Sequence, residues 1–308
     1  MTRVSTASNY SNVLANLMAA QGRQIAAGNE VSTQKKASDL KGYARQAETL
    51  TAMHSMQVRV KGYIDQTTAL SNRLSVQDAS LSQVKDAMAN AREAIANALA
   101  ADRGDTVMQE LGAAFSNVTG GLNAKNDGQY VFSGGQVNNP PTTATTMASL
   151  TAAPSIASLF QNGAHITVNR LDDSTTIQTG FLADQVGTAA FTAFAGVQAF
   201  QEGATGNFGG PLTEAQRTFL QGQLQIFDDA HEGMIQVVGQ NGLLQNRVED
   251  TQTDLGNRQS MLEGMVGNVT DVDMAAAYSR LEQAQISVQA AAQVFSTLSS
   301  ASLLNYLR

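Results

Sequence analysis

The chain is long enough for two ordinary domains, and its composition already excludes several classes of function. Of its 308 residues 43% are hydrophobic, so the chain can bury a core. A net charge of −7, with Lys35 and Lys36 as the best basic cluster, argues against a nucleic-acid partner. Because there is no cysteine, disulfides, thiolate metal sites and cysteine nucleophiles are excluded. Only 6% of the residues are aromatic, which is typical of long helices with thin apolar seams.

The sequence shows no recognisable signal peptide or membrane span. Residues Met1–Ala20 contain no apolar run of the signal-peptide type. The longest weakly polar stretch, Thr188–Phe200, is too short to cross a bilayer. We therefore expect no membrane contact, and either a cytosolic protein or one exported without a cleaved signal peptide.

The first segment, residues 1–42, is predicted to be a helix followed by a polar loop. Its apolar stripe is sparse, with Gln21, Gln24 and Gly28 diluting it, so the helix would be marginal alone. We assign this segment as an N-terminal assembly helix.

Residues 43–128 are predicted to form a long helical hairpin. Apolar residues recur at alternating spacings of three and four up to Ala101, and only Thr67 and Gln77 interrupt the seam. At 1.5 Å per residue such a helix would be about 88 Å long, whereas a compact globule of this chain length would be roughly 50 Å across. The seam therefore predicts an elongated rod, with the first helix ending at the turn signal Asp102–Asp105.

The periodicity changes over residues 129–210, which we predict to be a small β-containing outer domain. Two alternating runs, His165–Asn169 and Thr175–Thr179, flank the turn-forming Asp172–Ser174. A short helix is expected near Phe191–Phe200.

Helix is predicted to resume over 211–269, as the returning helix of the rod. Thr213 is a plausible N-cap, and Gly239–Gly242 is expected to kink the helix. A last helix, within residues 270–308, follows capping side chains that include Asp271 and Asp273. The predicted class is thus mainly α, an elongated rod of long antiparallel coiled-coil helices with a small inserted β-containing domain.

The apolar stripe of the last helix is too apolar to remain exposed. We expect the two ends of the chain to pair and to bury their remaining apolar faces against copies of the same subunit. The alternative is that they pack on the chain's own core. The predicted subunit-packing residues are Leu14, Met18, Ile25, Leu281, Val288, Phe295, Leu298, Leu303, Leu304 and Leu307.

No constellation of residues for catalysis, metal binding or cofactor binding is recognisable. The three histidines are His54, His165 and His231, and none has a partner at ligand spacing. A zinc-protease motif beginning at His231 would need a second histidine where Ile235 stands. We therefore predict no enzyme activity, no cofactor and no metal.

Several segments together resemble the bacterial flagellin superfamily. Residues Ser32–Asp39 are similar to the polar loop after the first terminal helix of that family, with Gln34 where glycine is usual and Leu40 where a second aspartate is usual. Leu244–Glu249 resembles the Asn-Arg-Leu/Phe core of the C-terminal region, and Asp271–Met274 resembles the acidic start of the last helix. The ending 303–308 fits the same family.

Within this superfamily, Gln129–Gly134 resembles the Arg-Tyr-Leu-Phe-Ser-Gly segment of the hook-filament junction proteins. The resemblance implies extracellular localisation in the flagellum and type III export without a cleaved signal peptide. It also implies an export chaperone on the C-terminal helix, and incorporation beside a hook-side junction protein and flagellin or hook protein. Terminal segments that become ordered only on assembly are a further implication.

The function predicted from the sequence is that of a structural, self-assembling subunit at the junction between hook and filament. Two alternatives stay open. One is a short flagellin that forms the filament itself, and the other is a secreted binding module or enzyme that uses the central domain.

Overall fold

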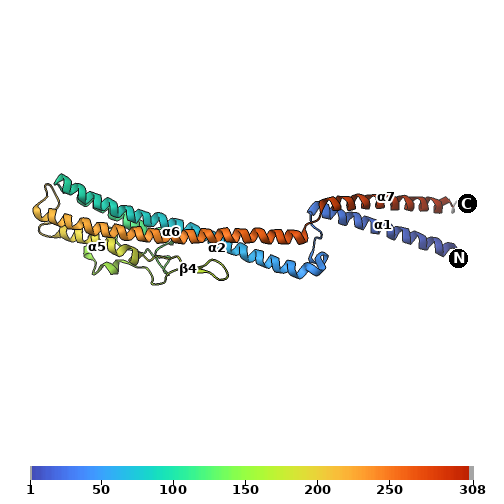
Figure 1. Ribbon diagram of the computed structural model, residues 1–308, viewed down its shortest axis with the longest axis horizontal. Helices are drawn as coiled ribbons and strands as arrows, with labels where there is room; N and C mark the ends of the chain where they lie inside the picture. The colour runs from blue at the N-terminus through green and yellow to red at the C-terminus, as the bar shows by residue number, and fades with distance from the viewer. Residues whose placement is uncertain (1, 305–308) are drawn as a thin grey trace. The chain divides into compact units, whose positions relative to one another are not determined.

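The computed structural model describes residues 2–304, with side chains described over residues 9–300 (Figure 1). Within these residues the protein consists mainly of long helices, with two small antiparallel sheets of two strands each, which confirms the predicted mainly α class with a small β region. The chain divides into two compact units. The terminal unit comprises Met1–Val60 and Asn257–Arg308, and the central unit comprises Lys61–Gly256.

The elements follow one another in chain order, and α2 and α6 each contribute to both units. The helices are α1 (Thr2–Thr33), η1 (Leu40–Gln46), α2 (Ala47–Ala101), α3 (Val107–Leu122), α4 (Ala148–Ala152), η2 (Ile156–Leu159), α5 (Ala183–Glu202), α6 (Glu214–Thr270) and α7 (Met274–Leu304). The strands are β1 (Lys125–Asn126), β2 (Gln129–Tyr130), β3 (Val168–Arg170) and β4 (Thr176–Gln178).

The predicted end of the first long helix is confirmed. α2 ends at Ala101, and Asp102 adopts a left-handed conformation with φ of 55°. The turn is held against the segment that leads into α6, because the Gly104 amide donates to the Gly210 carbonyl at 2.9 Å. The predicted N-cap is also confirmed, since Thr213 Oγ1 accepts from the Gln216 amide while Gln216 Oε1 accepts from the Thr213 amide.

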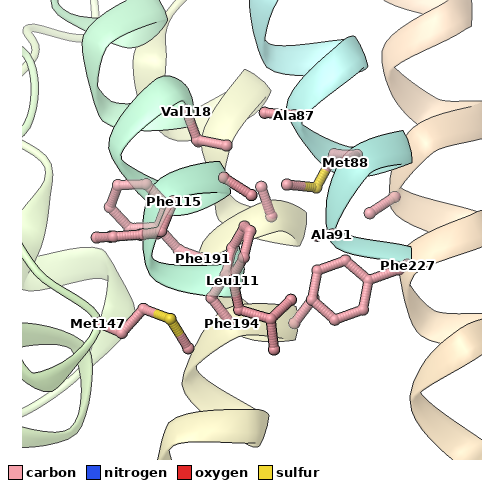
Figure 2. Close-up of a cluster of buried hydrophobic side chains, with 14 of the residues drawn as sticks. Ala87, Met88, Ala91, Leu111, Phe115, Val118, Met147, Phe191, Phe194 and Phe227 are labelled. Carbon is pink, nitrogen blue, oxygen red and sulfur yellow. The ribbon is translucent and has the colours of Figure 1, made fainter. Parts of the chain in front are cut away.

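The core of the central unit is a cluster of aromatic and aliphatic side chains between four helices (Figure 2). Phe115 of α3 lies between two rings of α5, at centroid distances of 5.3 Å to Phe191 and 5.4 Å to Phe194. Phe194 also meets Phe227 of α6 edge to face at 5.1 Å. All four rings are fully buried, and Met88 of α2 completes the contact. The side chains of a single chain therefore bury these large rings, which stabilises the folded central unit.

A buried polar layer joins α2 and α6 within the central unit. Gln77 Nε2 donates to Asn241 Oδ1 at 2.9 Å and to the Thr179 carbonyl at 3.2 Å. Asn241 Nδ2 in turn donates to the Leu74 carbonyl at 3.2 Å and to Asp78 Oδ1 at 3.1 Å. The predicted kink was wrong, because α6 continues through residues 239–242. The hydrogen bonds of Asn241 to α2 tie this part of α6 down.

The β region contains the two predicted runs as the antiparallel pair β3–β4, with Asn169 opposite Ile177. Leu171 and Ile177 are buried in a cluster with Leu70, Leu74 and Val248 of the long helices. In the turn, backbone and side-chain hydrogen bonds from Ser174 hold the pKa of Asp172 at about 2. The helix that follows, α5, is longer than predicted.

Candidate assembly surface on the terminal helices

In the terminal unit, α1 and α7 lie side by side and run antiparallel, as Figure 1 shows. Their common seam is built from small side chains, namely Ala20 and Ala27 of α1 and Ala277 and Ala284 of α7, all of them buried. An alanine side chain removes little apolar area from water, so this seam stabilises the pair only weakly.

Two contacts between larger side chains hold α1 and α7 together at different positions along the helices. Arg280 of α7 donates from Nη2 to Glu30 Oε2 of α1 at 2.6 Å and from Nε to the same oxygen at 3.1 Å. Nearer the ends of the chain, the rings of Tyr10 and Phe295 pack with their centroids 5.0 Å apart. These contacts set the register of the two helices without filling the space between them.

Large apolar side chains of both helices are exposed. On α1, Met18 is 63% exposed and Ile25 is 65% exposed. On α7, Tyr278, Ile286 and Val294 each expose more than half of their surface. A concentration of exposed apolar residues on a long helix pair is the signature of a surface that another molecule covers.

The predicted subunit-packing residues fall into three groups. Leu14, Met18 and Ile25 are exposed on α1, whereas the residues predicted on α7, which are Leu281, Val288, Phe295 and Leu298, are half-buried. The side chains of Leu303, Leu304 and Leu307 lie outside the described residues. The sequence did not predict the exposed Tyr278, Ile286 and Val294, because they lie outside the α7 stripe of apolar residues spaced three and four apart.

The segment that follows α1 pairs with the segment that precedes α7, and we name this pairing the clip (residues 34–36 and 268–272). The Lys36 amide donates to the Thr270 carbonyl at 2.8 Å, and the Val272 amide donates to the Gln34 carbonyl at 3.0 Å. Lys35 Nζ meets Asp271 Oδ1 at 2.5 Å. The clip thus joins the two ends of the helix pair that are far from the chain termini.

The lysine side chains of the clip contact acceptor groups that favour a positive charge. Lys36 Nζ donates to the carbonyls of Asn268 and Val269 at 3.2 and 2.9 Å, where the C-terminal end of α6 offers unpaired acceptors. The hydrogen bond from Lys35 lowers the pKa of Asp271. Asp273 accepts from the Ala275 amide at 2.9 Å and so caps α7 as predicted. The prediction that Asp271 is also a helix cap was wrong, because its carboxylate is held by Lys35 instead.

The backbone conformation in the clip gives a physical reason for the glycine that is usual at position 34 of the resembling loop. Gln34, which stands where the resembling loop usually has glycine, adopts φ of 58°. That left-handed conformation is free of steric cost only for glycine.

A small hollow of the central unit lies at the start of α5. It is lined in part by Phe160, Asn162, Asp184 and Thr188 and has a volume of about 250 Å³. Its only carboxylate, that of Asp184, already accepts from Asn162 Nδ2 at 3.0 Å and from the Gln185 amide at 2.8 Å. Among the described residues no group of three or more His, Cys, Asp or Glu side chains could hold a metal ion. None of the described helices has the length and apolar character that a membrane span requires.

Comparison with known families places the C-terminal part of the chain. Residues 224–307 match the family described as the bacterial flagellin C-terminal helical region. This part of the chain is therefore similar to the C-terminal helical region of bacterial flagellin. The matched residues include most of α6, the α6–α7 side of the clip and α7, so the exposed apolar residues of α7 lie in the flagellin-like region.

Solved structures with the same fold are flagellar proteins. One comes from Vibrio parahaemolyticus and is assigned as a flagellar hook-associated protein, with 13% identity and a TM-score of 0.59, covering 73% of this chain and 97% of that one. Another is FlgL of Bacillus cereus, with 17% identity and a TM-score of 0.53, covering 71% of this chain and 99% of that one. At these identities the likeness concerns the fold. No curated protein sequence matches the chain.

Proposed function

We propose that this chain is a structural subunit of the flagellin type at the junction between the hook and the filament of the bacterial flagellum. The observation that carries the proposal is the exposed apolar surface of α1 and α7, which lies partly within the flagellin-like region. Helices that expose side chains such as Ile25 and Ile286 are suited to packing against further copies of the same chain.

Two further observations favour the junction over other positions in the flagellum. The structures with the same fold include FlgL and a protein assigned as hook-associated. The segment 129–134 also resembles that of the hook-filament junction proteins, and within it Phe132 is fully buried in the central core. A β-carbon at Gly134 would lie 2.5 Å from the Gly163 carbonyl oxygen, so the glycine that ends the segment is required.

The proposed partners are copies of the chain itself, the hook-side junction protein, flagellin or hook protein, and an export chaperone on the C-terminal helix. The proposed localisation is extracellular, in the flagellum, after export without a cleaved signal peptide. A chain with this role needs neither catalysis nor a cofactor.

The family match also supports a second candidate, a short flagellin that forms the filament itself. Antibody labelling of isolated flagella separates the two. We expect a single labelled band where hook and filament meet. Labelling along the whole filament would support the flagellin instead, and the absence of label from flagella of expressing cells would refute both.

Deletion of the gene gives an independent test. Loss of a junction subunit should release flagellin into the culture medium, because the filament would have nothing to attach to. Loss of one flagellin among several need only shorten the filaments. Filaments that stay attached and of normal length would contradict the junction assignment.

A further inference from the structure

Charged side chains are rare on the paired terminal helices. Over the described side chains α1 and α7 carry four, which are Arg23, Glu30, Arg280 and Glu282. Glu30 and Arg280 pair with each other inside the chain. Arg23 and Glu282 are both exposed, and neither forms an ion pair with any described residue. The pair of helices therefore presents one unmatched positive charge and one unmatched negative charge.

Arg23 stands at a hollow between α1 and α7. The hollow has a volume of about 420 Å³. Besides Arg23, its wall contains Gln283 and the paired Glu30 and Arg280, and the rest is formed by the small side chains of Ala26, Ala27, Ala284 and Ser287. Because these side chains are short, the chain's own residues leave the space beside Arg23 open. The hollow can therefore receive a side chain from another molecule.

Glu282 lies on a ridge on another side of α7. At about 100° per residue, its side chain points roughly 200° around the helix from Ala284, which lines the hollow. Tyr278 and Ile286, each one turn from Glu282, are 58% and 62% exposed. The ridge thus presents one carboxylate between two large apolar side chains.

We propose that the ridge of one copy docks over the hollow of a neighbouring copy, so that Glu282 of the first pairs with Arg23 of the second. The inference rests on the proposed assembly function and specifies which surfaces meet. Charge complementarity selects a second copy as the occupant, because its ridge carries a carboxylate and Arg23 at the hollow has no ion-pair partner among the described residues. Tyr278 and Ile286 cover the flanks of the contact and shield the ion pair from water.

The geometry of this contact has a consequence for symmetry. Hollow and ridge are different surfaces, so each copy uses one of them to contact the copy before it and the other to contact the copy after it. Such a head-to-tail contact generates a ring or an open helix, whereas a two-fold contact would generate a closed dimer. The contact therefore has the type that a tubular assembly requires.

Crosslinking tests the contact directly, because the natural chain has no cysteine. Two separate variants, Arg23→Cys and Glu282→Cys, are produced in the same cells, and isolated flagella are treated with a short bismaleimide reagent. We expect a crosslinked dimer from the mixture and none from either variant alone. As a matched control, Ala292→Cys replaces Glu282→Cys, about 15 Å farther along α7, and the dimer should be lost.

Charge reversal gives a second test that does not depend on the reagent. Arg23→Glu or Glu282→Arg alone should reduce incorporation into flagella about five-fold, which corresponds to about 1 kcal/mol per contact. Both variants together should recover incorporation, because alternating copies restore opposite charges at every contact. Rescue in the mixture distinguishes a pair between copies from one within a copy.

The outcomes separate this inference from the proposed function. If isolated flagella contain the chain but the mixture neither crosslinks nor rescues incorporation, the Arg23–Glu282 contact is wrong and the assembly function stands. If the natural chain itself is absent from the flagella of cells that express it, the proposed function fails. Equal incorporation of all charge variants would also overturn the contact.

Discussion

The core of the central unit and the seam of the terminal helix pair use different side chains for the same task. Around Phe115 the central helices bury large aromatic rings within one chain, whereas α1 and α7 meet through alanines and expose Ile25 and Ile286. The first arrangement completes itself on folding. The second leaves apolar surface in water until another molecule covers it. We therefore propose that stability and assembly depend on separate parts of the sequence, and mutations should separate them.

The sharpest test of this division is Phe295→Asp. Phe295 packs on Tyr10 between the terminal helices, and a carboxylate there should abolish incorporation into flagella because it places a charge in an apolar contact. The free energy of unfolding of the central unit, measured by urea denaturation, should not change. Phe295→Leu keeps the apolar character and should still incorporate. Normal flagella from the aspartate variant would remove the terminal pair from the assembly surface.

The reciprocal change is Phe115→Ala in the central core. Removing this buried ring should lower the free energy of unfolding by about 3–5 kcal/mol, through lost burial and a residual cavity. Urea denaturation followed by circular dichroism measures it. Ile235→Ala is the control, because Ile235 is half exposed and its truncation should cost less than about 0.5 kcal/mol. Equal effects at the two positions would contradict the proposed core.

The buried polar layer should show an intermediate effect. Asn241→Ala removes one of the two acceptors of Gln77 Nε2 and the donor to Asp78 Oδ1, and should cost about 1–3 kcal/mol. The double variant Gln77→Leu/Asn241→Leu removes both amide side chains and should cost less than the single change. Urea midpoints of the three proteins decide the order. A neutral Asn241→Ala would show that the layer contributes nothing to the pairing of α2 and α6.

The clip should respond to acid, with no large change in total stability. The pKa of Asp271 is lowered by the hydrogen bond from Lys35, so its contribution is present above the ordinary value of 3.8 and is lost as pH falls through the lower folded value. The protection of the Lys36 and Val272 amides against hydrogen exchange, relative to the intrinsic exchange rate at each pH, should fall in that range. Asp172 is the internal reference, because its pKa of about 2 should keep its turn intact to lower pH. Asp271→Asn should weaken the acid response at the clip.

The regular parts of this fold were predictable because hydrophobic spacing reports which face of a helix is buried. The stop at Asp102, the N-cap at Thr213 and the paired runs around Asp172 followed from local rules that the structure obeys. The kink expected at Gly239–Gly242 is not found, since α6 continues there as helix. The hydrogen bonds of Asn241 to α2 join residues far apart in sequence, which no local rule predicts.

The assembly surface was only partly predictable, for a related reason. Apolar residues spaced three and four apart identify the face of a helix that packs within the chain. This spacing predicted Phe295, which contacts Tyr10. The exposed Tyr278 and Ile286 lie off that stripe, and in sequence they resemble scattered surface residues. Only the position of the alanine seam and of the hollow beside Arg23 shows that these residues form a separate face.

The smallest predicted effect concerns the backbone of the clip. Gln34→Gly should stabilise the terminal unit by up to about 1 kcal/mol, because a left-handed φ of 58° costs glutamine more than glycine. Asp102→Gly is the matched control at φ of 55°. Glycine removes the same backbone strain there, but the contact between Arg217 Nη2 and Asp102 Oδ1 at 2.6 Å is lost. The gain in the free energy of unfolding should therefore be smaller, or the variant should be less stable. Slower amide exchange at Val272, whose amide donates to residue 34, would report the gain. Faster exchange in the glycine variant would show that the Gln34 side chain matters more than its backbone.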